Sequence, residues 1–421
     1  MGLSHEGRHD GRFAKRVVRD TYDPLIQALV AVANRLPKRI DPKTGDPVMR
    51  PLSDKNILLG VCGGIAAFKA VEVLRLLVEQ GARVRVIASA NALNFVGETT
   101  FEALSKRPVC SQLFGPNTNA EAIGHIEWAQ TADAVLIAPA TANVIGKMAA
   151  GIADDALTTI LLAVTAPVLL CPAMNSRMYQ HPAVARNLQT LRHDGIVILP
   201  PDAGELACGT VGPGRLPDPR RIVEKLAICV ADKDLSGKTV LVTAGPTREM
   251  IDPVRYISNP STGKMGFAVA RAAAQRGANV ILVAGPGHLA DPVDVEVIRV
   301  QSAQQMAEAV LARFDHCDIV IKAAAVSDYR PIESEPHKRK KSDASLTLPL
   351  VRTMDILKTL GERKTRQILV GFAAETRSLQ ANATTKLKEK RLDLIVANNV
   401  ATESAGFGSD NNTVTLFYKA G

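Results

Sequence analysis

The chain has few aromatic residues and few cysteines for its 421 residues. Aromatics make up 4% of it, so Ala, Val, Leu and Ile must fill the interior, as in buried parallel strands and helices. The six cysteines form no CxxC pair and no His/Cys metal spacing, a reduced, cytosolic pattern that argues against a disulfide framework. No apolar run approaches the roughly 20 residues of a membrane span, and the first residues lack the order of a signal peptide. We therefore expect a cytoplasmic globular protein without a membrane partner.

Basic residues outnumber acidic ones, which gives a formal net charge of +9. This balance favours acidic ligands or acidic surfaces. Nucleic acid is the alternative ligand, but the basic residues are not interleaved with aromatic side chains that could stack on bases. We therefore predict no nucleic-acid partner.

The length of the chain favours two domains, because it exceeds what one ordinary core accommodates. Residues 1–52 stand apart as an N-terminal extension, in which 37–47 is rich in Pro, Lys and Asp and is typical of a loop. Apolar residues recur at helical spacing over 25–36 and predict one amphipathic helix. That helix either docks on a partner subunit, packs on its own domain or belongs to a mobile leader.

From residue 56 the pattern becomes strand, glycine loop, helix, strand, which is a βαβ unit of a parallel sheet. The expected strands of this first domain, 53–230, are 57–61, 84–88, 134–138 and 168–171. A polar linker at 231–238 follows, and the pattern restarts with a strand at 239–244, a helix within 263–276 and a strand at 280–284. We predict an α/β fold with two doubly wound parallel-sheet (Rossmann-like) domains, the second over 231–421.

Three loops of the first domain carry side chains suited to acid–base chemistry on a small molecule, namely His125, Asn175 and Cys208. Each has a plainer interpretation: a lone histidine is often a satisfied surface or core residue, and a lone cysteine is often an inert buried thiol. The glycines around Cys208, at 204, 209, 212 and 214, favour instead a segment that closes over a substrate.

A glycine turn at Gly63 and Gly64 lets backbone N–H groups approach a phosphate at a helix N-terminus, although a plain tight turn has the same sequence. The turn is not GxGxxG, so a mononucleotide such as FMN fits better than a dinucleotide. The loops at 138–143 and 172–175 offer hydroxyl and amide groups just past strands, where simple helix capping is the alternative role.

The second domain has its own glycine-rich loop and a basic run. The stretch 259–266 opens a helix and can cradle phosphate oxygens, but Met follows its lysine, so it is not a Walker A loop. The run at 337–341 is either a solvated face or an arm that neutralises a triphosphate. Lys386 and Lys390 lie one helical turn apart and share a face, which is either solvated or part of a site.

Taken together, the motifs of the first domain resemble the homo-oligomeric flavin-containing cysteine decarboxylases. Over about residues 55–418 the chain resembles the bacterial bifunctional phosphopantothenoylcysteine decarboxylase/phosphopantothenate–cysteine ligase family. The motifs that carry this resemblance are GVCGGIAAFK (60–69), GHIE (124–127), APATAN (138–143), GIADD (151–155), PAMN (172–175), ACGTVGPGR (207–215), VTAGPTREMIDPVRYISNPSTGKMG (242–266), AAAVSDYR (323–330), KRKK (338–341), VGFAAET (370–376) and SDNN (409–412).

For the first domain the resemblance implies oxidative decarboxylation followed by reduction, with FMN recycled without NAD(P)H. A hydride leaves the carbon that bears the substrate thiol, and the resulting thioaldehyde makes the carboxylate a good leaving group. His125 is the implied base or electrostatic partner, Asn175 holds the substrate carboxylate, and Cys208 protonates the enethiolate. The family forms trimers with FMN near the subunit interface, and these can build dodecamers. The implied FMN-binding residues are Gly63, Gly64, Ile65, Ser89, Ala140, Thr141, Asn143 and Met174.

For the second domain the resemblance implies that CTP, with Mg²⁺, activates the carboxylate of 4′-phosphopantothenate as an acyl-cytidylate, from which the cysteine amine displaces CMP. Asn259 serves the intermediate and its conversion, and Lys338 serves the activation step. Ligase-domain dimers would join the decarboxylase trimers. The implied nucleotide-binding residues are Gly245, Lys322, Ala323, Ala324, Asp328, Lys338, Met354, Asp355, Ile356, Leu357, Phe372, Lys386 and Lys390.

The sequence departs from the family pattern in four places. Cys62 replaces Ser, and since a thiol donates a weaker hydrogen bond, FMN binding is expected to persist but weaken. Phe68 replaces Tyr. The stretch 352–356 reads Arg-Thr-Met-Asp-Ile where some relatives have Lys-Asn-Pro-Asp-Ile, and loss of the proline alters the backbone preference of the residue before it. The sequence stops soon after Tyr418, so we expect a less stable ligase domain or dimer.

Two rival functions come from the same first fold. A prenyl-transferring flavoprotein would not need a cysteine in a glycine-rich loop, and the ligase half argues against it. A regulatory subunit that binds a phosphatase is the non-enzyme alternative, but such paralogues can lose the catalytic trio, and His125, Asn175 and Cys208 are all present.

Overall fold

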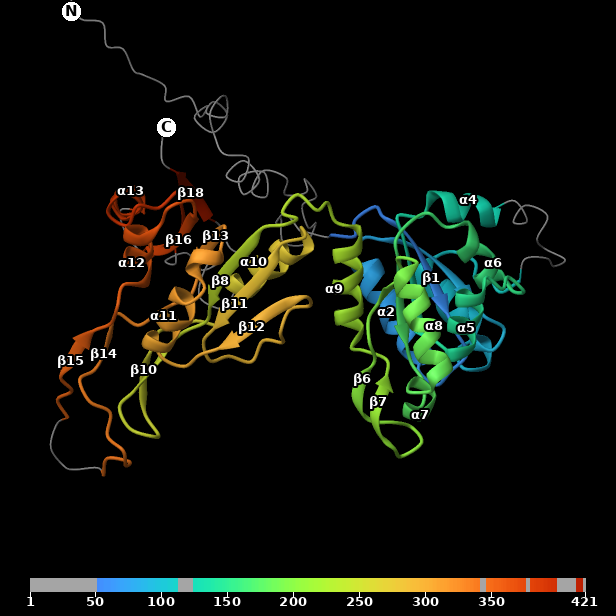
Figure 1. Ribbon diagram of the computed structural model, residues 1–421, viewed down its shortest axis with the longest axis horizontal. Helices are drawn as coiled ribbons and strands as arrows, with labels where there is room; N and C mark the ends of the chain where they lie inside the picture. The colour runs from blue at the N-terminus through green and yellow to red at the C-terminus, as the bar shows by residue number, and fades with distance from the viewer. Residues whose placement is uncertain (1–50, 113–123, 341–345, 376–378, 400–413, 419–421) are drawn as a thin grey trace, which may run out of the picture. The chain divides into compact units, whose positions relative to one another are not determined.

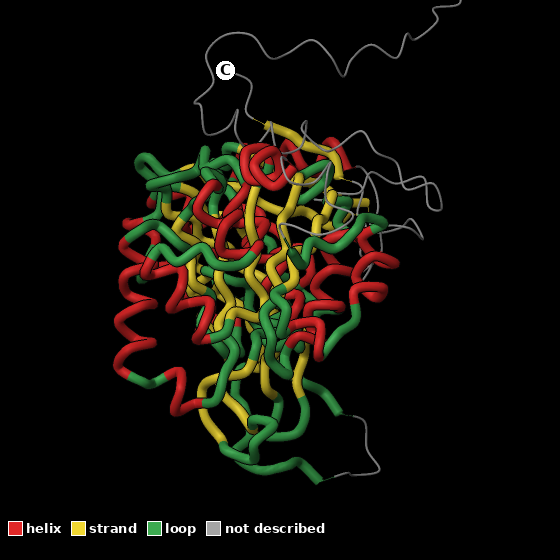
Figure 2. Tube along the Cα trace, turned by 90° about the vertical axis from the view of Figure 1, so that its right-hand side faces the viewer, coloured by secondary structure: helices red, strands yellow, loops and turns green. Residues whose placement is uncertain are grey.

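The structure, a computed structural model, describes residues 51–112, 124–340, 346–375, 379–399 and 414–418. It contains two sheets of mainly parallel strands, one in each half of the chain (Figure 1). Helices lie on both sides of the strands (Figure 2). The predicted α/β, doubly wound fold is therefore confirmed for both halves.

The first sheet has five parallel strands in the order β2-β1-β3-β4-β5. The four strands predicted in this half are all present. The chain leaves β1 toward β2 on one side and returns to β3 on the other, so the strand order reverses between β1 and β3. Loops at such a reversal form the usual ligand site of a doubly wound sheet. The strands are β1 Asn56–Val61, β2 Arg83–Ala88, β3 Ala134–Ala140, β4 Val168–Pro172 and β5 Val197–Ile198.

The longer helices pack on this sheet through apolar stripes. In α2, Ala67, Ala70, Val73, Leu74 and Leu77 recur at helical spacing and are all buried. The helices are α2 Ala67–Glu79, η1 Ala92–Asn94, α3 Glu98–Ser105, α4 Gly124–Thr131, α5 Ala142–Ala150, α6 Ala156–Ala163, α7 Ser176–Tyr179, α8 Pro182–His193 and α9 Pro219–Val230. An antiparallel hairpin of β6 (Asp202–Glu205) and β7 (Val211–Arg215) precedes α9.

The second sheet has seven strands in the order β12-β11-β8-β13-β16-β17-β18. All pairs are parallel except β17 with β18, which is antiparallel. Its strand order reverses between β8 and β13, which repeats the plan of the first sheet. The strands are β8 Thr239–Ala244, β11 Asn279–Ala284, β12 Val295–Arg299, β13 Ile319–Lys322, β16 Ile368–Glu375, β17 Leu394–Asn399 and β18 Val414–Tyr418.

Five helical segments and two short hairpins complete the described part of this half. The hairpins pair β9 (Arg248–Met250) with β10 (Tyr256–Ser258) and β14 (Tyr329–Pro331) with β15 (Leu350–Arg352). Sequence reasoning did not predict these hairpins. The helical segments are α10 Lys264–Gln275, α11 Ala303–Leu311, η2 Phe314–His316, α12 Ile356–Arg363 and α13 Leu379–Glu389.

The amphipathic helix predicted within 25–36 lies outside the described residues. Leu52, which we assigned to the N-terminal extension, is fully buried in the core of the first sheet. None of the described helices is long and apolar enough to cross a membrane.

Candidate functional site

The loops at the strand-order reversal of the first sheet bring the predicted phosphate turn beside the Thr141 loop. Gly63 packs so closely on Asn91 that a Cβ at Gly63 would lie 2.3 Å from Asn91 Cβ. A Cβ at Gly64 would meet only Thr141 Cγ2, at 3.8 Å, so Gly64 borders open space. Thr141 also caps α5, since its hydroxyl accepts a hydrogen bond from Val144 N at 3.5 Å. Thr141 therefore both caps α5 and lies at the edge of the sheet where a ligand is expected.

The other residues predicted to bind FMN lie at the same strand ends. Ile65 is 61% exposed and follows the glycine turn, and Ser89 follows β2, with its N–H bonded to Val61 O at 2.9 Å. Ala140 ends β3, Asn143 is exposed in the first turn of α5, and Met174 follows β4. The site thus offers open space at Gly64, the hydroxyl of Thr141 and the exposed amide of Asn143. These groups suit a phosphate and a polar heterocycle, and so a flavin mononucleotide.

Cys62, one of the departures, lies at the end of β1 and is fully buried. Burial raises the pKa of its thiol to about 12, although hydrogen bonds with Thr141 act in the opposite direction. The thiol is therefore protonated at neutral pH and, like a serine at this position, carries no charge toward a nearby phosphate.

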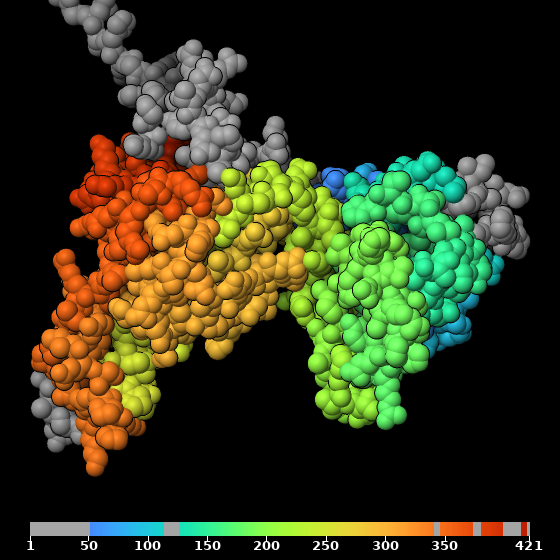
Figure 3. Space-filling model, viewed as in Figure 1, coloured from blue at the N-terminus to red at the C-terminus, as the bar shows by residue number. Residues whose placement is uncertain are grey.

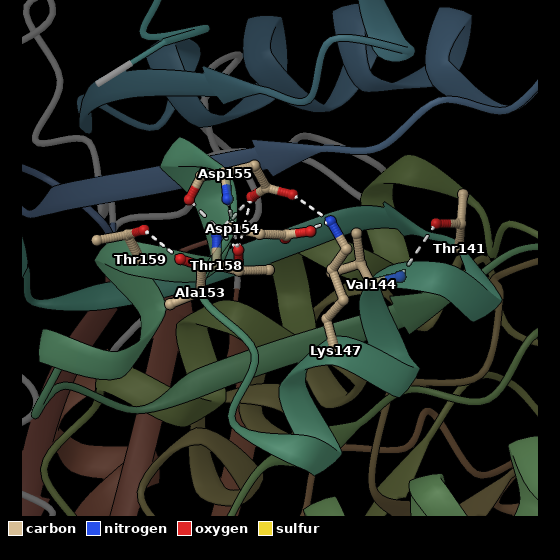
Figure 4. A network of polar contacts seen from close by, with 8 residues as sticks. All are labelled: Thr141, Val144, Lys147, Ala153, Asp154, Asp155, Thr158 and Thr159. Atoms are coloured by element: carbon tan, nitrogen blue, oxygen red, sulfur yellow. Dashed lines mark hydrogen bonds and ion pairs between the residues drawn. The ribbon is translucent and has the colours of Figure 1, made fainter. Parts of the chain in front are cut away.

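The GIADD motif forms a polar network with Lys147 of α5, the helix that Thr141 caps (Figure 4). Lys147 Nζ contacts Asp154 Oδ1 at 2.6 Å and Asp155 Oδ2 at 2.8 Å. Asp155 also caps α6 through a reciprocal pair of bonds with Thr158. The Asp154 and Asp155 hydrogen bonds raise the pKa of Lys147, so this lysine stays charged. We assign the motif a structural role that fixes α5 against α6.

Asn175 and Cys208 come together although 33 positions separate them in the sequence. Asn175 Nδ2 donates a hydrogen bond to Cys208 Sγ at 3.1 Å, while Asn175 Oδ1 caps α7 by accepting from Arg177 N at 2.8 Å. Cys208 is exposed in the turn of the β6–β7 hairpin, and Sγ also lies 3.2 Å from Thr210 Oγ1. The buried inert thiol, our alternative interpretation, does not apply. Figure 3 shows the hairpin, in yellow-green, on the molecular surface.

A close backbone contact holds the hairpin against the Asn175 loop. Met174 N donates to Gly214 O at 3.0 Å, and a Cβ at Gly214 would lie 2.1 Å from Met174 O. Gly214 has a φ of +152°, which side chains rarely adopt. Only glycine lets β7 approach the Asn175 loop this closely, so the glycine-rich segment forms a hairpin held against that loop; its closure over a substrate stays a prediction.

His125 begins the first turn of α4, which runs from Gly124 to Thr131. Its backbone is described but its side chain is not, so the predicted meeting of His125 with Asn175 and Cys208 remains a prediction.

In the second sheet, the loop after β8 meets the loop that opens α10. Gly245 and Gly263 both have left-handed backbone conformations, with φ of +78° and +79°, and a Cβ at Gly263 would lie 3.2 Å from Gly245 Cα. Asn259 reaches across to the loop after β13, where its Nδ2 donates to Val326 O at 3.0 Å. Ala323 and Ala324 lie in that same loop and donate their N–H groups to Thr243 O and Oγ1, each at 3.2 Å.

Several predicted nucleotide-binding residues form a cluster around Lys322 at the end of β13. Burial, together with the charges of Lys390 and Lys386, lowers the pKa of Lys322 to about 8, although Asp355 and Asp328 act in the opposite direction. Lys390 Nζ forms an ion pair with Asp355 Oδ2 at 2.8 Å, and Asp355 Oδ1 caps α12 at Lys358 N, 3.1 Å away. The charges of Asp328, Asp355, Lys386 and Lys390 thus all act on Lys322, and Lys390 is joined directly to Asp355.

Four further predicted residues differ in exposure. Met354 is 43% exposed, and Phe372 on β16 is partly buried. Ile356 and Leu357 are buried in the core of the second sheet, because their side chains form the apolar face of α12. Only the backbone N–H groups of Ile356 and Leu357 at the start of α12 are suited to contact a ligand.

Lys338 is exposed in a loop whose base is tied to the β9–β10 hairpin. The carboxylate of Asp252 is fully buried and accepts hydrogen bonds from Arg255 Nε at 2.9 Å and from Arg339 N at 3.3 Å. Arg255 also donates to Arg339 O at 2.9 Å, and its guanidinium holds the pKa of Asp252 well below its usual range. Within the described ranges, no hydrogen bond or ion pair joins Lys338 to the Lys322 cluster.

Sequence reasoning missed Thr210, Asp252 and Arg255 as site-building residues. The MIDPVR stretch offered a usable signal, since an acid and an arginine three residues apart in a turn often pair. Among the described residues, no cluster of three or more His, Cys, Asp or Glu side chains could hold a metal ion.

Comparisons with known proteins cover both halves of the chain. A family model described as Flavoprotein matches residues 47–230, and one described as DNA/pantothenate metabolism flavoprotein C-terminal domain matches residues 235–421. The Coenzyme A biosynthesis bifunctional protein CoaBC of Bacillus subtilis is 54% identical over 88% of this chain and 92% of its own length, and that of Escherichia coli is 46% identical over the same shares. A solved C-terminal domain of a CoaBC protein is 48% identical, covers 45% of this chain and 85% of its own length, and has a TM-score of 0.39. With such identity over nearly the whole length of these relatives, the chain belongs to the family of coenzyme A biosynthesis bifunctional proteins, CoaBC.

Proposed function

We propose that the chain ligates 4′-phosphopantothenate to cysteine with CTP and then decarboxylates 4′-phosphopantothenoylcysteine to 4′-phosphopantetheine with FMN. The observation that carries the decarboxylase half is the 3.1 Å contact between Asn175 Nδ2 and Cys208 Sγ beside the strand-order reversal of the first sheet. An amide donor and an accessible thiol meet there at the edge where ligands bind. The family to which the chain belongs supports both halves of the proposal.

In the decarboxylase site, FMN bound at Gly63, Gly64, Ile65, Ser89, Ala140, Thr141, Asn143 and Met174 would accept and return a hydride. Asn175 has an amide group that can turn from the Cys208 sulfur to a substrate carboxylate. Cys208 is exposed, so its S–H can deliver a proton to the substrate carbon after CO₂ has left. His125, as the proposed base or electrostatic partner, acts in the first stage.

In the ligase site, three cationic side chains face the charge that develops as pyrophosphate leaves. These would be Lys322, Lys386 and Lys390, of which the last two act electrostatically on Lys322, and Lys338 belongs to a loop anchored by Asp252 and Arg255. Positive groups near a leaving pyrophosphate stabilise the transition state. Asn259, whose Nδ2 donates to Val326 O, would hold the activated carboxylate. Mg²⁺ would enter with the triphosphate, which supplies most of its oxygen ligands.

We further propose a homo-oligomer, in which decarboxylase-domain trimers join ligase-domain dimers into a dodecamer. Ile65 and Phe68, which are 61% and 59% exposed beside the glycine turn, support contacts with another subunit at this edge. A cytoplasmic location follows from the reduced cysteine pattern.

The test is product analysis by mass spectrometry of the purified protein supplied with 4′-phosphopantothenate, cysteine, Mg²⁺ and either CTP or ATP. We expect 4′-phosphopantetheine and CMP with CTP. Cys208→Ser should still release CO₂ but stall the final reduction, so that an oxidised enethiol accumulates. Normal turnover by Cys208→Ser would refute the role of the thiol, and absence of any coupled product with either nucleotide would refute the ligase half.

A further inference from the structure

The sulfur of Cys208 has two polar neighbours that come from different parts of the chain. Asn175 Nδ2 lies 3.1 Å away at the start of α7, and Thr210 Oγ1 lies 3.2 Å away in the same hairpin. Both neighbours are uncharged hydrogen-bonding groups. Asn175 belongs to the proposed substrate site, whereas nothing above gives Thr210 a part in the chemistry.

The hairpin turn fixes Thr210 where its hydroxyl meets the sulfur. Leu206 N donates to Thr210 O at 2.9 Å, and Gly209 N donates to Leu206 O at 2.8 Å, which closes the turn around Cys208. Gly209 has a φ of +78°, a left-handed conformation that allows this tight turn. The Cys208–Thr210 contact is therefore built into the backbone of the turn.

We infer that Thr210 is a positioning residue of the decarboxylase half, whose hydroxyl holds the Cys208 sulfur and stabilises it once the thiol has given up its proton. The catalytic part of this inference rests on the proposed function. In that step the S–H bond of Cys208 breaks and a C–H bond forms at the substrate carbon. The electron pair of the S–H bond stays on sulfur, the reduced cofactor supplies the hydride, and the thiolate is reprotonated from water.

The electrostatics around Cys208 agree with this geometry. Hydrogen bonds with Thr210, and then with Asn175, lower the pKa of the Cys208 thiol. The charged groups on the packed elements are Arg177 of α7 and Asp202, Glu205 and Arg215 of the hairpin, and none of the described contacts joins them to Sγ. The thiolate is thus favoured by neutral donors, so losing one donor has a measurable effect.

The cysteines of this chain make the thiol directly measurable. All six lie in described segments: Cys62, Cys110, Cys171 and Cys317 are buried, Cys229 is partly buried, and Cys208 is exposed. Alkylation of the native full-length protein with iodoacetamide, followed at the Cys208 peptide by mass spectrometry over a pH series, reports the fraction of thiolate. This readout requires neither substrate nor turnover.

Thr210→Val removes the hydroxyl and keeps the shape of the side chain. We expect its alkylation profile to move to higher pH, with a rate at pH 7 about fivefold lower than that of the wild type. Thr210→Ser restores a hydroxyl and should return the profile toward the wild type. Thr190→Val, which removes an exposed hydroxyl on α8, is the matched control and should leave the profile unchanged. Identical profiles for Thr210→Val and the wild type overturn the inference.

Turnover separates this inference from the proposed function. With phosphopantothenoylcysteine as substrate, Thr210→Val should lower kcat with little change in KM and accumulate the oxidised enethiol. If the wild type releases no CO₂ while the alkylation profile still shifts, the proposed function fails and the role of Thr210 toward the thiol stands. If turnover is normal in Thr210→Val despite a shifted profile, the catalytic part of the inference is overturned.

Discussion

Gly214→Ala should selectively disable decarboxylation, because it forces the β6–β7 hairpin away from the Asn175 loop. A Cβ at this position would lie 2.1 Å from Met174 O, whereas real Cβ contacts stay at 3.0 Å or more. The difference, 3.0 minus 2.1, is 0.9 Å, by which β7 or the Met174 loop must move. Such a shift breaks the seating of Cys208 beside Asn175, and a misplacement of this size can cost about 100-fold in rate. Overpacking should also cost about 1–3 kcal/mol of stability.

The assay measures CO₂ release from phosphopantothenoylcysteine and, in the same preparation, CMP formation by the ligase half. We expect CO₂ release to fall about 100-fold and CMP formation to stay near the wild-type rate. Gly195→Ala is the matched control: Gly195 also has a positive φ, +87°, but nothing lies within 4 Å of its added Cβ. Wild-type decarboxylation by Gly214→Ala would refute the argument that this contact sets the geometry of the site.

Three other changes should have distinct effects. Lys322 has a pKa of about 8, below its unfolded value, so its positive charge is present at lower pH and is lost as the pH rises through 8. The affinity for CTP, measured by calorimetry, should therefore fall as the pH rises through 8. In Lys322→Arg the affinity should not change with pH over this range, because arginine stays charged. Burial of this charge also destabilises the folded state at pH values below the folded pKa. The midpoint temperature of unfolding of the wild type should therefore increase as the pH is raised from 8 to 10. Lys338→Gln should slow pyrophosphate release at least tenfold, about 1.4 kcal/mol, whereas Lys340→Gln should not slow it. Equal effects of the two substitutions would mean that the basic run is only a solvated face. His125→Asn should abolish CO₂ release and spare CMP formation, and a joint loss of both activities would contradict two separate sites.

The sequence predicted the parallel strands well because their signal is local and strong. The run at 239–244 is mostly apolar and contains no charged residue, as a strand covered on both faces requires, and glycine follows it at the turn. The β9–β10 and β14–β15 hairpins escaped prediction, since each strand has only three residues and no alternating pattern at that length. Their pairing depends on tertiary contacts such as the bond from Glu335 N to Ile251 O.

Site residues were predictable where a motif marks a strand end and not where the role depends on a long-range contact. Gly64 and Thr141 could be placed at the ligand edge because each follows a central strand. Asn175 and Cys208 were predicted to serve one site, but their direct contact was not, since no local pattern relates the start of α7 to a hairpin turn. Ile356 and Leu357 were predicted to bind the nucleotide, but their side chains lie in the core of the second sheet.

Strand β18 has a consequence for how the chain can be shortened or tagged. It pairs antiparallel with β17, whose residues Leu394, Ile395, Val396 and Ala397 are buried, and so it covers the backbone of an apolar strand at the rim of the second sheet. A truncation that removes Val414 to Tyr418 would leave that rim as a template for strands of other chains, which is the usual start of edge-to-edge aggregation. A protein cut there should precipitate on expression even though every residue of both sites is retained, whereas a polar tag added beyond Tyr418 keeps the rim covered.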